Sequence, residues 1–277
     1  MDARRACAAL GCGLALAGLS TRALAALFER SELRDLCLST LALELVLAGA
    51  TLFLAAGARR APRDALGLAP WRASAPRLCL VALGALGLSA ALDGGLTRSG
   101  LRDASVLASV DELLRASSGS DLVLATAALV LAPALAEELL CRGLVQRALA
   151  ARVAPGFAVL GASVLFGALH LEWIQGGAAA LLGVYLGLVA WRLDSTRPAV
   201  LCHLLNNGVA LASSALELPF DGSRTPVLVA GLALAAAGLA ALPRAAPLPG
   251  TVEPAHAAGG ASPVVSTLQS ERRSDDS

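Results

Sequence analysis

Lysine is absent from this sequence, and all 22 of its basic residues are arginine. Walker-type phosphate loops and Schiff-base enzymes both depend on a lysine side chain, so these functions are excluded. Aromatic residues make up 3% of the chain and charged residues 16%, whereas roughly a quarter of the residues in a soluble domain are charged. The formal net charge of +1 gives no indication of a nucleic-acid partner. The composition is therefore not that of a water-soluble globular protein.

The 277-residue chain is instead rich in apolar residues, which make up 56% of it and give a mean hydropathy of +0.69. Alanine, leucine, valine and glycine supply most of this fraction, and they favour helices or allow helices to pack closely. Because a spanning helix needs about 20 mainly apolar residues, about eight spans are expected. We predict an all-α, polytopic membrane helix bundle. The expected spans are residues 6–28, 36–57, 78–93, 121–148, 153–171, 174–191, 198–217 and 226–243.

The segments outside these spans give further expectations. Residues 99–117 carry apolar residues at helical spacing with charged residues between them, which predicts a helix lying at the membrane interface. Residues 245–277 are rich in Ala, Pro, Gly and Ser, and they predict a disordered tail. The distribution of arginine places both termini in the cytoplasm, which for a bacterial protein means a multi-pass protein of the plasma (inner) membrane. An alternative interpretation of residues 1–25 is a cleaved signal peptide.

Several common catalytic and metal-binding motifs are missing. The sequence has no HExxH helix of zinc proteases and no GxSxG nucleophile turn. No two cysteines form a CxxC pair, so we interpret the cysteines as small apolar core residues rather than disulfide or metal ligands. The cysteines are Cys7, Cys12, Cys37, Cys79, Cys141 and Cys202.

Ionisable and strongly polar side chains inside the expected spans are few and therefore informative. Each costs several kcal/mol in a membrane unless it is paired or faces a cavity. They are Glu44, Glu137, Glu138, Arg142, His170, His203, Asn206 and Asn207.

Helical spacing indicates roles for some of these residues. Glu138 and Arg142 are four residues apart, so a carboxylate and a guanidinium can pair on one helix face. Glu137 then has no obvious local partner, which suits a general base. His203 and Asn207 are also four apart, and two aligned polar groups of this kind can hold a developing oxyanion. The alternative interpretation is structural, with the same side chains acting only as interhelical hydrogen-bonding groups.

Three motifs in this order resemble a known family. APALAEELLCRG contains EExxxR, from Glu137 to Arg142; LFGALH contains FxxxH, from Phe166 to His170; and CHLLNNGVA contains HxxxN, beginning at His203. Together they resemble the CPBP family of intramembrane proteases, which includes type II CAAX prenyl endopeptidases and bacteriocin-processing or immunity-linked proteins. The resemblance covers about residues 120–215, so we expect 120–217 to form the catalytic helices, 1–119 an N-terminal membrane region and 218–244 the last span.

The resemblance implies an endopeptidase that hydrolyses a peptide bond of a membrane-associated substrate, such as a CAAX-type prenylated peptide. It implies that Glu137 and His170 activate a water molecule. It also implies that His203 and Asn207 bind the carbonyl oxygen as it becomes an oxyanion. The residues with implied supporting roles are Glu138, Arg142 and Phe166.

The family is often described as metalloproteases, so zinc is a possible cofactor. If zinc is used, Glu137, His170 and His203 are the candidate ligands. Asn207 is a poor zinc ligand, and we favour a metal-free mechanism. The competing hypothesis for the whole protein is a non-catalytic immunity or scaffold protein, and a transporter is a weaker one because two symmetric halves with broken helices are not seen.

One geometric condition follows from this hypothesis. His203 lies only about six residues from the expected inner end of its span, which leaves it about 16 Å short of His170 if the helices are straight and equal. A shared site therefore requires the inner link at 192–198 to lie deeper in the bundle, or span five to tilt.

Overall fold

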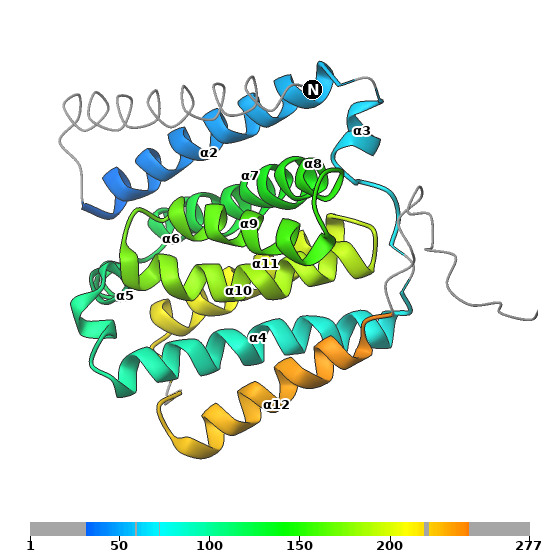
Figure 1. Ribbon diagram of the computed structural model, residues 1–277. Coiled ribbons are helices and arrows are strands. Elements are labelled where there is room, and N and C mark those ends of the chain that lie inside the picture. The colour runs from blue at the N-terminus through cyan, green and yellow to red at the C-terminus, as the bar shows by residue number, and fades with distance from the viewer. Residues whose placement is uncertain (1–31, 59, 72, 219–221, 244–277) are drawn as a thin grey trace, which may run out of the picture. The chain divides into compact units, whose positions relative to one another are not determined.

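The computed structural model describes residues 32–58, 60–71, 73–218 and 222–243 (Figure 1). Every regular element within these ranges is helical, which confirms the predicted all-α class. The expected span at 6–28, the alternative signal peptide and the predicted disordered tail at 245–277 lie outside the described residues.

The helices follow the expected apolar segments closely. The α-helices are α2 (Glu32–Ala56), α3 (Pro62–Ala65), α4 (Ala75–Arg98), α5 (Val106–Arg115), α6 (Ser120–Ala125), α7 (Ala132–Glu138), α8 (Arg147–Ala150), α9 (Pro155–Ala168), α10 (Trp173–Arg192), α11 (Arg197–Ala215) and α12 (Thr225–Ala241). One 3-10 turn, η1 (Arg102–Ala104), and two π-helical stretches, η2 (Thr126–Leu131) and η3 (Leu139–Gln146), complete them.

Four stretches in the described part of the chain are long and apolar enough to cross a membrane. They are Glu32–Ala56, Ala75–Arg98, Ser120–Ala150 and Trp173–Arg192. The helices α9 and α12 are apolar but shorter, so the span expected at 153–171 is reduced to the 14 residues of α9. A membrane helix bundle fits these lengths, whereas the number of about eight passes stays a prediction.

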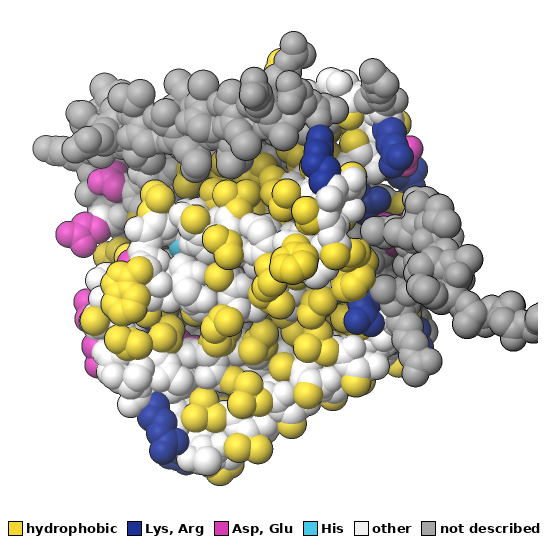
Figure 2. Space-filling model, viewed as in Figure 1, with side chains coloured by type: hydrophobic (Ala, Val, Ile, Leu, Met, Phe, Trp, Pro, Cys, Tyr) yellow, Lys and Arg dark blue, Asp and Glu magenta, His cyan; other side chains and the backbone are white. Residues whose placement is uncertain are grey.

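The surface is also that of a membrane protein. Figure 2 shows hydrophobic side chains spread across one face of the molecule, with most of the charged side chains toward its edges. Large apolar side chains are well exposed on several helices, as expected for a surface that faces lipid tails. Examples are Phe53, Phe157, Val164 and Leu181.

Residues 120–150 form one continuous helical segment that carries both of the π-helical stretches seen in the described residues. The segment runs α6, η2, α7, η3 and α8 (Figure 1). Pro133 lies in the first turn of α7, and a proline inside a helix has no N–H to donate to the carbonyl four residues earlier. That carbonyl belongs to Leu129, in η2. Because π-helical turns change the register of a helix and are common at functional sites, the short α7 between them is a natural place for a site.

Small residues bring α4 and α12 into close contact. A side chain at Gly87 of α4 would meet the backbone oxygen of Gly231 of α12 at 2.7 Å, so only glycine fits there. Tyr185 of α10 reaches the same part of the bundle, where its hydroxyl donates to the carbonyl of Val81 at 2.8 Å. These contacts join α4, α10 and α12 without bulky apolar side chains.

The helix expected at the membrane interface is α5, and it packs onto the end of the bundle. Asp111 on its polar face accepts from Arg102 at 2.7 Å and from the hydroxyl of Ser214 in α11. Leu114 on its other face is buried. Part of the polar face is thus used inside the protein rather than turned toward lipid headgroups.

The link between α10 and α11 lies deep in the protein. Ser195 and Thr196 are 0% and 1% exposed. The Thr196 hydroxyl donates to the carbonyl of Leu66 at 2.7 Å, and its backbone N–H donates to that of Gly67 at 2.9 Å. This buried link meets the condition stated above, because it starts α11 well inside the bundle and brings His203 to the depth of the other polar residues.

Candidate functional site

The EExxxR motif forms a buried ion pair that also fixes a neighbouring helix. Arg142 donates to Glu138 at 2.7 Å, and both side chains are fully buried. The second guanidinium nitrogen of Arg142 donates to the carbonyl of Gly183 in α10 at 2.9 Å. One turn along, Gln146 donates to the carbonyl of Gly187 at 3.0 Å. The segment 120–150 is therefore attached to α10 by two polar contacts whose acceptors are glycine carbonyls.

Phe166 links the three motifs. Its ring lies under the Arg142 guanidinium, with 4.3 Å between the guanidinium carbon and the ring centroid. The rings of His170 and His203 both meet it edge to face, each at 5.4 Å between centroids. Since a single aromatic ring contacts all three groups, the residues of the three sequence motifs form one cluster.

His203 is held in a defined tautomer by Glu138. Its Nδ1 lies 3.0 Å from Glu138 Oε1, and a carboxylate can only accept, so we assign the proton to Nδ1. In the neutral ring Nε2 then carries the lone pair, which accepts from the Asn207 amide at 3.2 Å. The same Nε2 lies 3.9 Å from Glu137 Oε2. One face of His203 is thus fixed by Glu138, and the other faces Glu137.

Asn207 is oriented by an unusual backbone acceptor. Its amide nitrogen donates to the carbonyl of Leu129 at 3.0 Å. Pro133, four residues after Leu129, has no N–H to donate to this carbonyl. The side-chain oxygen of Asn207 accepts a hydrogen bond from the side chain of Asn206 at 3.1 Å. The proline in α7 therefore prepares an acceptor that positions an amide on α11.

Glu137 lies between His203 and a second carboxyl group. The residue is 7% exposed, and no N–H or hydroxyl among the described residues donates to its Oε2. Its carboxyl group lies within hydrogen-bonding distance of that of Glu44 in α2. Arg142 forms its ion pair with Glu138 at 2.7 Å rather than with Glu137, as the helical spacing predicted.

His170 lies in the turn that follows α9. Its Nδ1 is 3.0 Å from the carbonyl of Phe166. A carbonyl accepts, so we assign the proton to Nδ1, which leaves the lone pair on Nε2. The next residue, Leu171, has a φ of 56°, and this left-handed conformation reverses the chain into α10. The turn thus fixes His170 by a local bond and leaves Nε2 as the basic atom.

The residues named as candidate zinc ligands differ in which of their side-chain atoms are already bonded within the protein. The candidate zinc ligands were Glu137, His170 and His203. The Nδ1 atoms of both histidines are bonded to Phe166 and Glu138, and His203 Nε2 accepts from Asn207. Within the described ranges, no three His, Cys, Asp or Glu side chains are arranged to hold a metal ion. The metal-free mechanism stays a prediction.

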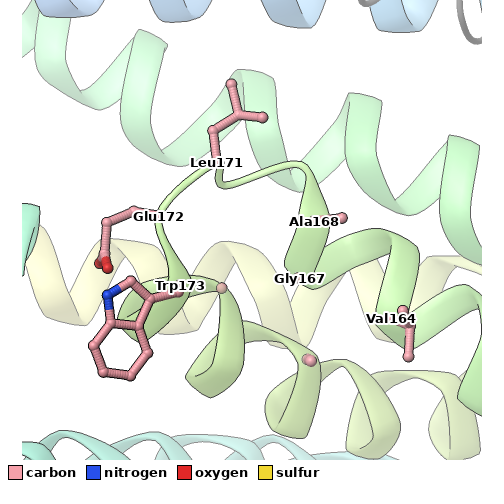
Figure 3. Close-up of a pocket in the computed structure, with 8 residues that line it drawn as sticks. Val164, Gly167, Ala168, Leu171, Glu172 and Trp173 are labelled. Atoms are coloured by element: carbon pink, nitrogen blue, oxygen red, sulfur yellow. The ribbon is translucent and has the colours of Figure 1, made fainter.

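A shallow pocket of about 390 Å³ lies beside the turn that carries His170 (Figure 3). Leu171 and Trp173 are 87% and 75% exposed. They point away from each other at the two ends of the turn (Figure 3). Gly167 and Gly176 lie in close contact between α9 and α10, where a side chain at Gly176 would meet the Gly167 carbonyl oxygen at 2.7 Å. The pocket gives the neighbourhood of His170 an open apolar surface.

Glu172 closes the N-terminus of α10 beside this pocket. Its carboxylate accepts from the hydroxyl of Ser105 at 2.6 Å, and from the backbone N–H groups of Gln175 at 2.9 Å and Ile174 at 2.7 Å. These hydrogen bonds lower the pKa of Glu172 below its ordinary value, and the bond from Ser105 has the largest effect. The carboxylate thus caps α10 and ties it to the segment before α5.

The structure brings together the side chains that the motifs singled out. Contacts within hydrogen-bonding or ring-stacking distance connect Arg142, Glu138, His203, Asn207, Phe166 and His170. Sequence reasoning noted Glu44 only as an ionisable residue in span two and did not place it beside Glu137. No local spacing could have done so, because Glu44 lies on a separate helix. The roles of these residues in a reaction stay predictions.

Comparison with known proteins supports the resemblance. Residues 119–209 match the family model described as Type II CAAX prenyl endopeptidase Rce1-like. Searches of curated proteins and of solved structures found no match. The matched range includes all three motifs and agrees with the 120–215 expected from the sequence.

Proposed function

We propose that this protein is an intramembrane endopeptidase with Glu137 as its general base, and the match of residues 119–209 to the model described as Type II CAAX prenyl endopeptidase Rce1-like supports this. The observation that carries the proposal is the position of Glu137. Its carboxyl group is buried, is not paired with Arg142, and lies 3.9 Å from His203 Nε2. A carboxylate with a free oxygen beside a histidine suits proton removal from water.

The first step is activation of water. Glu137 removes a proton from the water, and the Nε2 lone pair of His170 accepts a hydrogen bond from it and orients it. The resulting hydroxide attacks the carbonyl carbon of the scissile peptide bond. When the C–N bond breaks, the proton held by Glu137 passes to the leaving nitrogen, which balances the hydrolysis.

The second step is stabilisation of the oxyanion by Asn207, whereas His203, whose proton lies on Nδ1 toward Glu138, has no N–H to offer the oxyanion in this tautomer. Both N–H groups of Asn207 are bonded in the resting structure, one to Leu129 and one to His203 Nε2. A substrate carbonyl oxygen that reaches this N–H group of Asn207 can replace His203 Nε2 as its acceptor. One preorganised donor of this kind contributes about 2.7–4 kcal/mol to the transition state.

Glu138, Arg142 and Phe166 have positioning roles in this proposal. Glu138 accepts from Arg142 and from His203, so its negative charge fixes the histidine and is itself balanced by the guanidinium. Phe166 packs against both histidines. We expect substitutions of these residues to affect stability as well as activity, since each contacts several buried groups.

The proposed substrate is a peptide whose cleavage site lies at the membrane. A peptide ending in a prenylated CAAX-type sequence is the first substrate to test, because the description of the matched family names this kind of substrate. Membrane-associated peptides without a prenyl group form the second set. The open apolar pocket beside His170 offers one surface on which such a peptide can approach the site.

The test is cleavage of a pool of fluorogenic, membrane-associated peptides by the purified full-length protein in lipid vesicles. Glu137→Gln keeps the size of the side chain but removes the base, so cleavage should fall by about 10²-fold or more. Glu112→Gln, an exposed glutamate on α5, is the matched control and should cleave like wild type. Cleavage should persist when a zinc chelator is added.

Two results would contradict the proposal. Undiminished cleavage by the Glu137→Gln variant would remove Glu137 from the mechanism. No cleavage of any peptide in either set, by a protein that is inserted and folded, would favour the alternative in which the polar cluster only holds the helices together.

A further inference from the structure

The turn between α9 and α10 carries His170 and is weakly held by its own residues. The backbone hydrogen bonds inside it are long, at 3.2 Å from His170 to Gly167 and 3.3 Å from Leu171 to Ala168. Leu171 has a left-handed backbone with a φ of 56°, which is unfavourable for a residue with a side chain. The exposed side chains of Leu171 and Trp173 do not anchor this part of the turn. Other contacts must therefore hold it.

Glu172 supplies such contacts from the end of the same turn. Its Oε1 accepts from the backbone N–H of Ile174 at 2.7 Å, and its Oε2 accepts from that of Gln175 at 2.9 Å, so the carboxylate caps α10. Oε2 also accepts from the hydroxyl of Ser105 at 2.6 Å. The side chain of Glu172 leaves the turn in a different direction from that of Leu171 (Figure 3). Glu172 thus bonds the turn to a segment 67 residues earlier in the chain.

Ser105 is itself fixed in the bundle. It is 5% exposed, and its hydroxyl oxygen caps α5. Three residues earlier, Arg102 pairs with Asp93 of α4 and with Asp111 of α5, each at 2.7 Å. Asp111 also accepts from the hydroxyl of Ser214 in α11. The bond from Ser105 to Glu172 therefore connects the turn after α9 to α4 and to α11, the helix of the HxxxN motif.

We propose that Ser105 is a positioning residue, whose hydroxyl holds Glu172 and thereby keeps the ring of His170 in place for orienting the water. This inference rests on the proposed function, in which His170 Nε2 accepts a hydrogen bond from that water. A displacement of about 1 Å in a reacting geometry can lower a rate about 10²-fold. The proposal extends the site beyond the matched residues 119–209 to the segment before α5.

The kinetic test separates the link to Ser105 from the cap of α10, in the full-length protein in vesicles. Ser105→Ala removes the hydroxyl, so kcat should fall at least about fivefold, while KM should stay within about twofold because His170 acts on the water. Glu172→Asp keeps a carboxylate that can cap α10, but it is one methylene shorter and does not reach Ser105. Its kcat should fall by a similar factor.

The double variant and a matched control complete this test. Because both changes break the same bond, Ser105→Ala combined with Glu172→Asp should lose no more kcat than either change alone. Ser117→Ala is the control, because the Ser117 hydroxyl donates to the carbonyl of Leu113 within its own segment, and it should match wild type. All rates are measured well below the unfolding midpoint of each variant. Losses that multiply in the double variant, or an unchanged kcat in Ser105→Ala, would overturn the role of Ser105.

A spectroscopic test is independent of activity. In nuclear magnetic resonance spectra of protein with isotope-labelled histidine, the signals of His170 are assigned by their loss in His170→Gln. Wild type and Ser117→Ala should show the ring-nitrogen shifts of a fixed tautomer with the proton on Nδ1, which lies 3.0 Å from the carbonyl of Phe166. In Ser105→Ala the two shifts should move toward each other, because a loosened turn lets the tautomers exchange. Unchanged shifts would contradict the proposal, whereas the proposed function fails separately, if wild type itself cleaves nothing.

Discussion

Replacing Arg142 by methionine is expected to destabilise the protein by about 3–5 kcal/mol, because it leaves a buried carboxylate without its cationic partner. Arg142 and Glu138 are fully buried and 2.7 Å apart. Arg142 also donates to Gly183 and lies on the ring of Phe166. Methionine fills much of the same space, so the loss reports on the charge and the hydrogen bonds rather than on an empty cavity.

The same substitution at an exposed pair provides the control. Arg147 lies five residues further along the same helical segment and pairs with Asp194 at 3.1 Å, and the Asp194 side chain is 87% exposed. A surface pair of this kind contributes about 0–1 kcal/mol. Arg147→Met should therefore change stability little.

The assay is thermal unfolding in a mild detergent, followed with a dye that reacts with thiols. Cys37, Cys141 and Cys202 are free and buried, so they become reactive when the helices separate, whereas exposed Cys79 sets the baseline. At about 2–4 °C per kcal/mol, Arg142→Met should lower the midpoint by about 6–20 °C and Arg147→Met by about 4 °C or less.

A double variant completes the argument. Glu138→Gln combined with Arg142→Met removes both charges, so it should recover part of the stability lost by Arg142→Met alone. Equal midpoints for Arg142→Met and Arg147→Met would refute the reasoning, since they would mean that the buried carboxylate does not need its partner.

Two further predictions concern the scaffold. Gly87→Ala should destabilise the protein by about 1–3 kcal/mol, because the added methyl group would lie 2.7 Å from the carbonyl oxygen of Gly231. Gly95→Ala, on the same helix, is the control, because its methyl group would meet nothing within 4 Å. Equal unfolding midpoints for the two variants in the thiol assay would contradict this prediction. The lowered pKa of Glu172, caused first by the Ser105 hydroxyl, means that its contribution to stability is complete above the unfolded pKa of about 4.3 and is lost as the pH falls through the lower folded value. Wild type should therefore be more stable than Glu172→Gln at pH 7, and the difference should shrink near pH 3; a difference independent of pH would argue against it.

The membrane helices could be predicted from the sequence because apolar runs report directly on burial in lipid. Where the prediction was wrong, the cause was packing rather than composition. The span expected at 153–171 is the shorter α9 because the chain reverses at Leu171. The two π-helical stretches could not be predicted from hydropathy, although Pro133 deprives the carbonyl of Leu129, in one of them, of its usual donor.

The site could be predicted only as far as helical spacing reaches. Glu138 and Arg142 are four residues apart, as are His203 and Asn207, and a helix brings side chains at this spacing together. The contact between Glu44 and Glu137 joins separate helices, so only the fold reveals it. The depth of His203 likewise depends on the burial of Thr196, which nothing in the surrounding sequence indicates.

The buried link before α11 sets an order of events during synthesis. The carbonyl of Leu66 is made 130 residues before the Thr196 hydroxyl that donates to it. At ribosomal rates of about 5–20 residues per second, it waits roughly 6–26 s for that partner. The segment 119–209 carries the family motifs, but its last helix docks on a loop that left the ribosome long before. A fragment limited to that segment would therefore lack the template on which α11 assembles, and we expect the polar cluster to form only after the N-terminal helices have inserted.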